Sequence, residues 1–121
     1  MKNGFYWSKR LECYSDYFYL PTNLDDGKSW FSFPLIIKPG SPFSRRDITQ
    51  YLHDSKIENR PIMAGNVASH PAMKYFKYRA SGLVNSELIH NNGFFWGNHQ
   101  KMKSDQCEYV ADCMNKFMKK Y

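Results

Sequence analysis

Residues 30–52 read WFSFPLIIKPGSPFSRRDITQYL, and this stretch decides the fold class. Aromatic and β-branched residues fill its first part, which predicts a strand over 30–38. Pro34 interrupts that strand and indicates an edge position or a bulge, because proline has no N–H for the ladder. After a Pro-Gly turn, Ser44 is a good N-cap, with an acidic residue three positions later, which predicts a helix over 45–56.

Two segments flank this unit. Residues 5–19 carry aromatic and apolar side chains at helical spacing, which predicts a helix that ends before Pro21. Residues 57–60 resume an extended path. The following segment, 61–80, contains two prolines and several small residues and is expected to be a loop. Ordered loops of this length in compact domains often carry function.

The C-terminal third predicts a helix, a strand and a second helix. Asn85 is expected to cap a short helix over 86–91, and the apolar run 94–96 is expected to form a strand. Ser104 is expected to cap an amphipathic helix, whose apolar face would carry Cys107, Val110, Ala111, Met114 and Phe117. The resulting order, α-β-α-β-loop-α-β-α, predicts a small layered α/β or α+β domain.

Composition narrows the class of protein. A chain of 121 residues with 42% hydrophobic and 23% charged residues is one globular domain or part of a larger one. The aromatic share of 17% favours a well-filled core or a large interface. The net charge of +6 permits anionic ligands, but the lysines are scattered, so we expect no nucleic-acid partner. No apolar run is long enough to span a membrane, so we expect no membrane partner.

The three cysteines are Cys13, Cys107 and Cys113, an odd number without a CxxC pair. Together with a polar N-terminus that does not resemble a signal peptide, they indicate free thiols in a reducing, cytoplasmic compartment. The four histidines do not cluster with them at ligand spacing, so we expect no metal site. No nucleophile or phosphate-loop motif appears, and we assign no catalytic residue.

Residues that could bind a ligand lie on two segments. Arg60 follows a predicted strand, where its fork of donors suits a phosphate or carboxylate, or equally a surface ion pair with an acidic residue. Gly65 and Asn66 form a turn, in which the asparagine could contact a ligand or bond its own backbone. Asn98 and His99 follow the predicted strand 94–96, and strand ends often bind ligands. A capped turn is the alternative there.

In this order the motifs resemble the C-terminal small domain of the DegT/DnrJ/EryC1/StrS family. The resemblance rests on the stretch quoted above, on R-x-x-x-A-G-N at 60–66, on HP and YR further along, and on NSELIHNNGFFWGN at 85–98. It runs from about residue 5 to 118. The most similar branch is of the CDP-4-keto-6-deoxyglucose 3-dehydrase type, although Asn98-His99 departs from that pattern.

The resemblance implies a fold and a domain organisation. These enzymes have the aspartate-aminotransferase fold, fold-type I, whose small domain is a short, mainly antiparallel sheet packed against helices. Residues 1–20 would be a helix that links a missing large domain, and 21–121 would be the C-terminal small domain.

The resemblance also implies a function. The complete enzyme would be a homodimer that uses pyridoxal phosphate (PLP) on a keto-deoxy sugar nucleotide, by transamination or dehydration, in lipopolysaccharide or deoxysugar biosynthesis. Arg60, Gly65, Asn66, Asn98 and His99 would line the side of the nucleotide-sugar substrate. The residues that hold PLP belong to the large domain, so this chain alone would bind no PLP and be inactive. The alternatives are a subunit that docks on a separate large domain and a stand-alone sugar-nucleotide-binding module.

Overall fold

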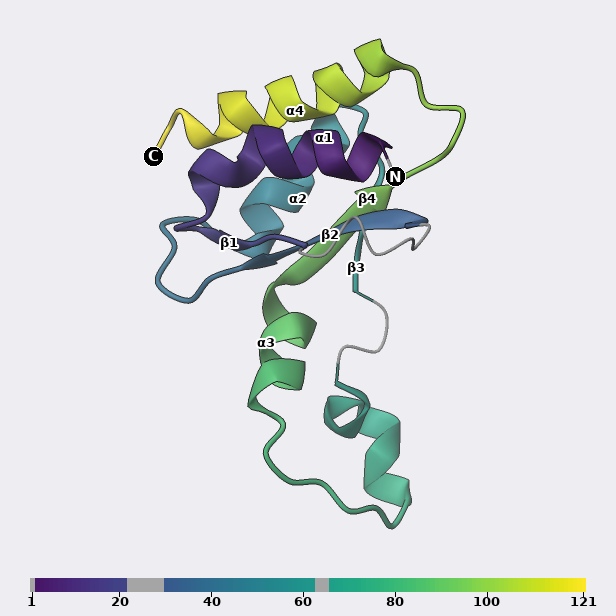
Figure 1. The fold of residues 1–121 in the computed structure, drawn as a ribbon. Coiled ribbons are helices and arrows are strands. Elements are labelled where there is room, and N and C mark those ends of the chain that lie inside the picture. The colour runs from purple at the N-terminus through teal and green to yellow at the C-terminus, as the bar shows by residue number, and fades with distance from the viewer. Residues whose placement is uncertain (1, 22–29, 63–65) are drawn as a thin grey trace.

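A four-stranded antiparallel sheet forms the middle of the computed structural model, with strands in the order β1-β2-β4-β3 (Figure 1). The structure describes residues 2–21, 30–62 and 66–121. The helices and strands are α1 (Lys2–Leu11), β1 (Phe18–Tyr19), β2 (Ser32–Ile37), α2 (Arg45–Asp54), β3 (Asn59–Pro61), α3 (Val84–Asn92), β4 (Gly93–Gly97) and α4 (Ser104–Met118), with short 3-10 helices η1 (Glu12–Tyr14), η2 (Val67–Ser69) and η3 (Pro71–Tyr75). The predicted class, a small and mainly antiparallel sheet packed against helices, is confirmed.

The strand that contains Pro34 is interior in the sheet, yet its proline breaks no ladder bond on the β1 side. β1 pairs only with Ile36 and Ile37 of β2, whereas β4 runs along β2 with Pro34 opposite Phe95. The predicted edge position is therefore wrong for the strand, but among the described residues Pro34 itself is paired on one side alone, so its missing N–H breaks no bond to β1.

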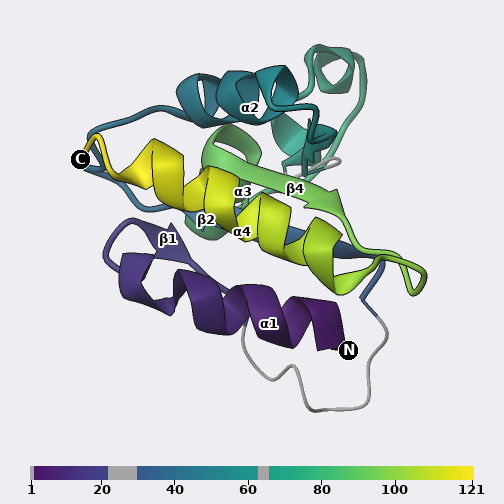
Figure 2. The same ribbon diagram turned by 90° about the horizontal axis from the view of Figure 1, so that it is seen from above.

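Three helices cover one face of the sheet, with α4 between α1 and α2 (Figures 1 and 2). Alternate residues of β2 point into this layer, because successive side chains of a strand face opposite ways. Trp7 of α1 meets Phe33 of β2 and Trp96 of β4 edge to face, with ring centroids 5.5 and 5.6 Å apart. The predicted apolar face of α4 is buried in the same core, through Cys107, Val110, Ala111, Met114 and Phe117.

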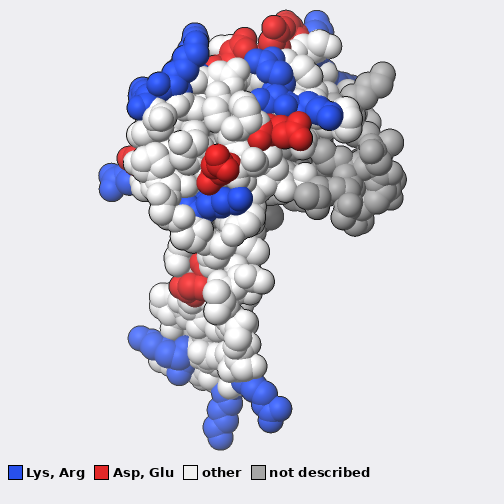
Figure 3. Space-filling model, turned by 60° about the vertical axis from the view of Figure 1, so that its left-hand side comes forward, with Lys and Arg blue, Asp and Glu red and all other residues white. Residues whose placement is uncertain are grey.

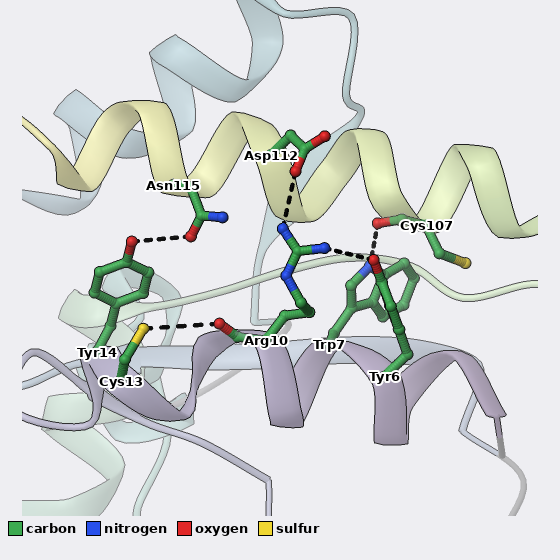
Figure 4. A network of polar contacts seen from close by, with 8 residues as sticks. All are labelled: Tyr6, Trp7, Arg10, Cys13, Tyr14, Cys107, Asp112 and Asn115. Atoms are coloured by element: carbon green, nitrogen blue, oxygen red, sulfur yellow. Dashed lines mark hydrogen bonds and ion pairs between the residues drawn. The ribbon is translucent and has the colours of Figure 1, made fainter.

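The helices α1 and α4 lie side by side and run in the same direction (Figure 4). The Tyr14 hydroxyl donates to Asn115 Oδ1 at 2.9 Å, and Arg10 Nη2 lies 2.8 Å from Asp112 Oδ1. Both pairs are separated by nearly the same number of positions, 101 and 102, which is the signature of parallel helices in fixed register. The N-terminal helix is thus part of the core that the rest of the chain builds.

The predicted helix over 5–19 is wrong in its second half. α1 ends at Leu11, and Phe18 and Tyr19 instead pair with Ile37 and Ile36 of β2. Phe18 is almost fully buried, and its ring packs against Phe43 with centroids 5.5 Å apart. Burial of this aromatic side chain outweighs the local helical pattern, as tertiary packing commonly does.

The predicted start of α2 is confirmed in detail. Asp47 N donates to Ser44 Oγ at 3.2 Å, and Ser44 N donates to Asp47 Oδ2 at 2.9 Å, which completes a capping box. The helix ends at Asp54, and Lys56 then takes a positive φ of 66° that turns the chain toward β3. Arg45, one residue past the cap, donates to the carbonyl oxygens of His90 and Gly93 at 2.7 and 3.3 Å, and so ties α2 to the junction of α3 and β4.

Residues 66–83, which we call the arm, project from the sheet between β3 and α3 (Figure 1). The sequence predicts a loop here, and the arm contains the two short helices η2 and η3 followed by an irregular return to α3. The two ends of the arm lie close together, because the arm follows β3, α3 leads from it into β4, and β3 and β4 are paired neighbours.

Candidate functional site

Arg60 lies in the middle of β3, opposite Phe95 of β4. Its neighbour Asn59 pairs with the buried Trp96, so Arg60 points to the sheet face away from the three helices. Its guanidinium contacts the carboxylate of Glu58 at 2.8 Å, with both side chains exposed, at 67% and 80%. An ion pair this exposed contributes little free energy, so an anionic ligand could replace Glu58 at small cost.

Asn66 is the one polar residue that is buried among those described, at 5% exposure. Its Nδ2 donates to Glu87 Oε2 on α3 at 2.5 Å, and Ser69 Oγ donates to the same oxygen at 2.8 Å. Asn91 Nδ2 donates to the other carboxylate oxygen at 3.3 Å. The hydrogen bonds from Ser69, Asn66 and Asn91 hold the pKa of Glu87 below its usual value, since they favour the charged carboxylate. Asn66 therefore fastens the arm to α3.

Both the nitrogen and the oxygen of the Asn98 side-chain amide form hydrogen bonds within the chain. Its Nδ2 donates to the carbonyl of Trp30 at 2.8 Å, and its Oδ1 accepts from Asn3 Nδ2 at 3.1 Å. His99 is exposed, and its Nδ1 accepts from the backbone N–H of Lys101 at 3.0 Å. These contacts form the capped turn that the sequence left open as an alternative for this pair.

The residues predicted for one site do not form one cluster in the structure. Asn66 is bound to α3, which precedes β4, whereas Asn98 and His99 follow β4 at its other end. Arg60 lies between them, beside the middle of β4. Gly65, the remaining predicted site residue, lies outside the described residues.

An open depression of about 620 Å³ lies within the arm and brings together residues that the sequence analysis did not single out. Asn66 lines it together with Tyr78, Arg79 and Ser81 of the arm and Ser86 of α3. The Tyr78 hydroxyl lies 3.5 Å from the carbonyl of Ala68 and closes the return of the arm on η2. The run KYFKYR at 74–79, basic and aromatic without an acid, was the available signal in the sequence.

The cysteines are free thiols, two of them buried in the core, as expected for α4. Burial raises the pKa of Cys107, which is the opposite of what a nucleophilic thiol needs. Among the described residues, no three His, Cys, Asp or Glu side chains gather as a metal site would require. In the same part of the chain, none of the helices has the length and apolarity needed to cross a membrane.

Comparison with known proteins identifies the family. The family model of the DegT/DnrJ/EryC1/StrS aminotransferases matches residues 2–115, nearly the whole chain. The chain therefore belongs to this family, as the motifs predict.

The curated relatives include a dehydratase of a GDP-linked keto sugar and a lipopolysaccharide biosynthesis protein. The chain is 35% identical over 116 residues to the GDP-4-keto-6-deoxy-D-mannose 3-dehydratase of Escherichia coli O55:H7, a match that covers 93% of this chain and 29% of the relative. It is 29% identical over 117 residues to the lipopolysaccharide biosynthesis protein RfbH of Salmonella typhimurium, covering 95% of this chain and 27% of that one. The chain thus spans less than a third of the length of these curated relatives.

Solved structures agree with this assignment. A crystal structure of GDP-4-keto-6-deoxymannose-3-dehydratase with a trapped PLP-glutamate geminal diamine matches with a TM-score of 0.78 and 32% identity, over 93% of this chain and 29% of that chain. A mutant of the same enzyme with bound GDP-perosamine matches over the same shares with a TM-score of 0.79 and 32% identity. A family member from Brucella abortus, 14% identical over 96% of this chain and 29% of that one, shares the fold with a TM-score of 0.75.

Proposed function

We propose that this chain is the C-terminal part of a PLP-dependent enzyme that acts on a GDP-linked keto-deoxy sugar in lipopolysaccharide or deoxysugar biosynthesis. The observation that carries the proposal is the 35% identity to a GDP-4-keto-6-deoxy-D-mannose 3-dehydratase over 93% of this chain. The reaction is a dehydration or a transamination. We place the enzyme in the cytoplasm, where a sugar nucleotide is available to a chain with free thiols.

The described residues do not fit PLP by themselves. A lysine that carries this cofactor needs a desolvated pocket, and every lysine whose side chain the structure describes is exposed or half-buried. When bound, PLP supplies an electron sink for the chemistry at the sugar. In our proposal a large domain outside this chain holds PLP, and the chain alone binds none and is inactive.

The apolar side chains on the open face of the sheet support the proposal that a second domain packs there. Pro34, Ile36 and Phe95 are half-buried on this face, and Phe31 beside them is 72% exposed, with its ring centroid 6.2 Å from that of Phe95. Exposed aromatic groups of this kind mark contact surfaces. We propose that the large domain covers this face, that residues 1–20 lead from it into the small domain 21–121, and that the complete enzyme is a homodimer.

Arg60 has the best placement of the proposed substrate residues. It lies on the same open face, opposite Phe95, where the large domain would bring the substrate. Its fork of donors suits the diphosphate of a sugar nucleotide. Asn66, Gly65, Asn98 and His99 remain proposed substrate-side residues, with Asn66 and Asn98 placed by the hydrogen bonds described above.

A chimaeric enzyme tests the proposal. This chain would replace the matching C-terminal segment of the Escherichia coli dehydratase, to which it is 35% identical over 116 residues. We expect the purified chimaera to bind PLP and to consume GDP-4-keto-6-deoxymannose, and the product identifies dehydration or transamination. In it, Arg60→Ala should raise KM at least tenfold, whereas Arg46→Ala, an exposed arginine on α2, should leave KM within twofold.

Two outcomes would contradict the proposal in different ways. A folded chimaera that holds PLP but consumes no GDP-linked keto sugar would remove the proposed substrate class. An active chimaera in which Arg60→Ala matches Arg46→Ala would remove Arg60 from the site and leave the substrate class in place. The alternative function, a stand-alone binding module, predicts that the unmodified chain binds the sugar nucleotide without PLP while every chimaera is inactive.

A further inference from the structure

A depression of about 600 Å³ lies where the end of β4, the connection from α2 to β3 and the first turns of α4 meet. Its apolar walls come from Ile57, Trp96, Met102, Tyr109 and Val110. The volume lies within the usual range for small-molecule sites, roughly 300–1,000 Å³. Because β4 ends there and the arm precedes α3 and the start of β4, the depression is separate from the arm.

Trp96 gives this depression a polar group in need of a partner. Its side chain is 1% exposed, and among the described residues its indole N–H has no hydrogen-bond partner. Trp7, whose ring meets that of Trp96 edge to face, donates its own indole N–H to the carbonyl of Cys107 at 3.0 Å. A buried donor without a partner costs free energy, which a ligand with an acceptor would recover.

The charges around the depression nearly cancel. Lys56 and Asp105 line it with opposite charges, and the carboxylate of Glu58, which also lines it, pairs with Arg60. Over the body of the molecule, blue and red atoms are interspersed in Figure 3. A neutral ligand therefore fits this depression better than an ionic one.

We infer that the depression binds a neutral, mainly apolar molecule with a carbonyl oxygen, which accepts the indole N–H of Trp96. Ile57 and Val110 contact the apolar body of the ligand, and the ring of Tyr109 packs against a planar group. The indole nitrogen is closed to water, so the ligand reaches it when the half-buried and flexible side chain of Met102 turns aside.

This site goes beyond the proposed function and does not depend on it. Trp96 points into the layer of helices, where it packs against Trp7, whereas Arg60 points to the opposite face of the sheet. A ligand in the depression is therefore a different molecule from the sugar nucleotide.

The experiment is a titration of the unmodified, ¹⁵N-labelled 121-residue chain with acetophenone, a neutral aromatic ketone, followed by NMR of the indole N–H groups. The chain has three tryptophans. Trp7→Phe and Trp30→Phe each remove one indole signal, and so assign the third to Trp96. We expect the Trp96 indole proton to move downfield in a saturable manner, because it gains a hydrogen bond, while the Trp7 proton keeps its position.

Ethylbenzene and two tyrosine variants test which groups recognise the probe. Ethylbenzene keeps the ring and lacks the carbonyl, so it should bind at least about threefold more weakly than acetophenone. Tyr109→Ala should weaken acetophenone binding at least about threefold, because an aromatic contact is lost. Tyr19→Ala is the matched control, since Tyr19 is 48% exposed, compared with 50% for Tyr109, and lies on β1; it should change the affinity less than about twofold.

Several results would overturn the inference. They are the absence of a saturable shift of the Trp96 signal, an equal shift of the Trp7 signal, ethylbenzene binding as tight as acetophenone, and equal effects of Tyr109→Ala and Tyr19→Ala. Competition between acetophenone and GDP would also overturn it, since it would place the probe in a nucleotide site. Consumption of the keto sugar by the chimaera tests the proposed function separately from all of these.

Discussion

The indole nitrogen of Trp7, on α1, donates a hydrogen bond to the carbonyl oxygen of Cys107, on α4, at 3.0 Å (Figure 4). The two residues are 100 positions apart, and the Trp7 side chain is fully buried. A buried indole N–H that finds a partner avoids a large desolvation cost. This bond joins the N-terminal helix to the first turn of the C-terminal helix and fixes the register of the pair.

Trp7→Phe should lower the free energy of unfolding by about 1–3 kcal/mol, because the hydrogen bond from the indole to the carbonyl of Cys107 is lost and part of the ring volume becomes a void. Urea unfolding followed by far-UV circular dichroism measures this change. Phe5→Leu on the same helix, at a position 46% exposed, serves as control and should stay within about 0.5 kcal/mol. A Trp7→Phe chain as stable as the wild type would show that this bond contributes nothing.

Gly93 and Gly97 at the two ends of β4 should respond oppositely to alanine. A Cβ at Gly93 would lie 2.5 Å from the carbonyl oxygen of Ile89 and 2.7 Å from Ile62 Cδ1, whereas a Cβ at Gly97 meets nothing within 4 Å. Gly93→Ala should therefore cost about 1–3 kcal/mol through overpacking, and Gly97→Ala should be neutral or slightly stabilising. Thermal unfolding of the two variants side by side tests the difference, and equal melting temperatures would contradict it.

Ser44→Ala should destabilise the chain by about 0.5–2 kcal/mol, because the capping box at the start of α2 loses its side-chain acceptor. The matched control is Arg46→Ala, two residues further on and exposed, which should stay within about 0.5 kcal/mol. The measurement is chemical denaturation with the m-value held common to both variants. If Ser44→Ala lowers the free energy of unfolding no more than Arg46→Ala does, the capping box does not stabilise the start of α2.

The attachment of the arm should weaken in acid. The pKa of Glu87 in the folded chain lies below its ordinary value. The ionised carboxylate therefore stabilises the attachment of the arm fully above the ordinary carboxyl pKa, and this stabilisation is lost as the pH falls through the folded pKa. Amide exchange of Ser69 and His70, whose N–H groups bond within η2, reports on the arm. Their protection should fall at least about threefold as the pH falls through the lowered pKa of Glu87, and Glu87→Gln should show the lower protection already at neutral pH.

Glu58→Gln is the control for the arm, because the carboxylate of Glu58 contacts only the exposed Arg60 among the described residues. It should leave the protection of both amides unchanged at every pH. If Glu87→Gln retains wild-type protection at neutral pH, the three hydrogen bonds to this carboxylate do not hold the arm.

Local signals in the sequence were sufficient for several elements. The Ser44 cap, the apolar face of α4 and the strand at 94–96 each depend on neighbouring residues, and the structure has all three. Boundaries shifted where local signals were ambiguous. The N-cap of α3 is Leu83, two residues before the expected cap Asn85, and the helix begins at Val84. The N-cap of α4 is Lys103, one residue before the expected cap Ser104.

The candidate site was less predictable, because its contacts join distant segments. Asn66 finds Glu87 21 positions away, and Asn98 finds Trp30 68 positions away. Neither spacing nor composition indicates these two hydrogen bonds. An asparagine that stabilises a turn therefore cannot be distinguished in the sequence from one that binds a ligand. The end of α1 was missed for the same reason, since the partners of Phe18 lie in β2 and beside Phe43.

The pairing of Pro61 with Phe94 allows the segment between them to vary in length. The chain leaves the sheet at Pro61 and returns beside it, so the segment between them can change length without moving any strand. Doubling the length of such an excursion costs only about 0.6 kcal/mol of closure entropy. A longer or shorter arm is therefore compatible with the same layer of helices and strands.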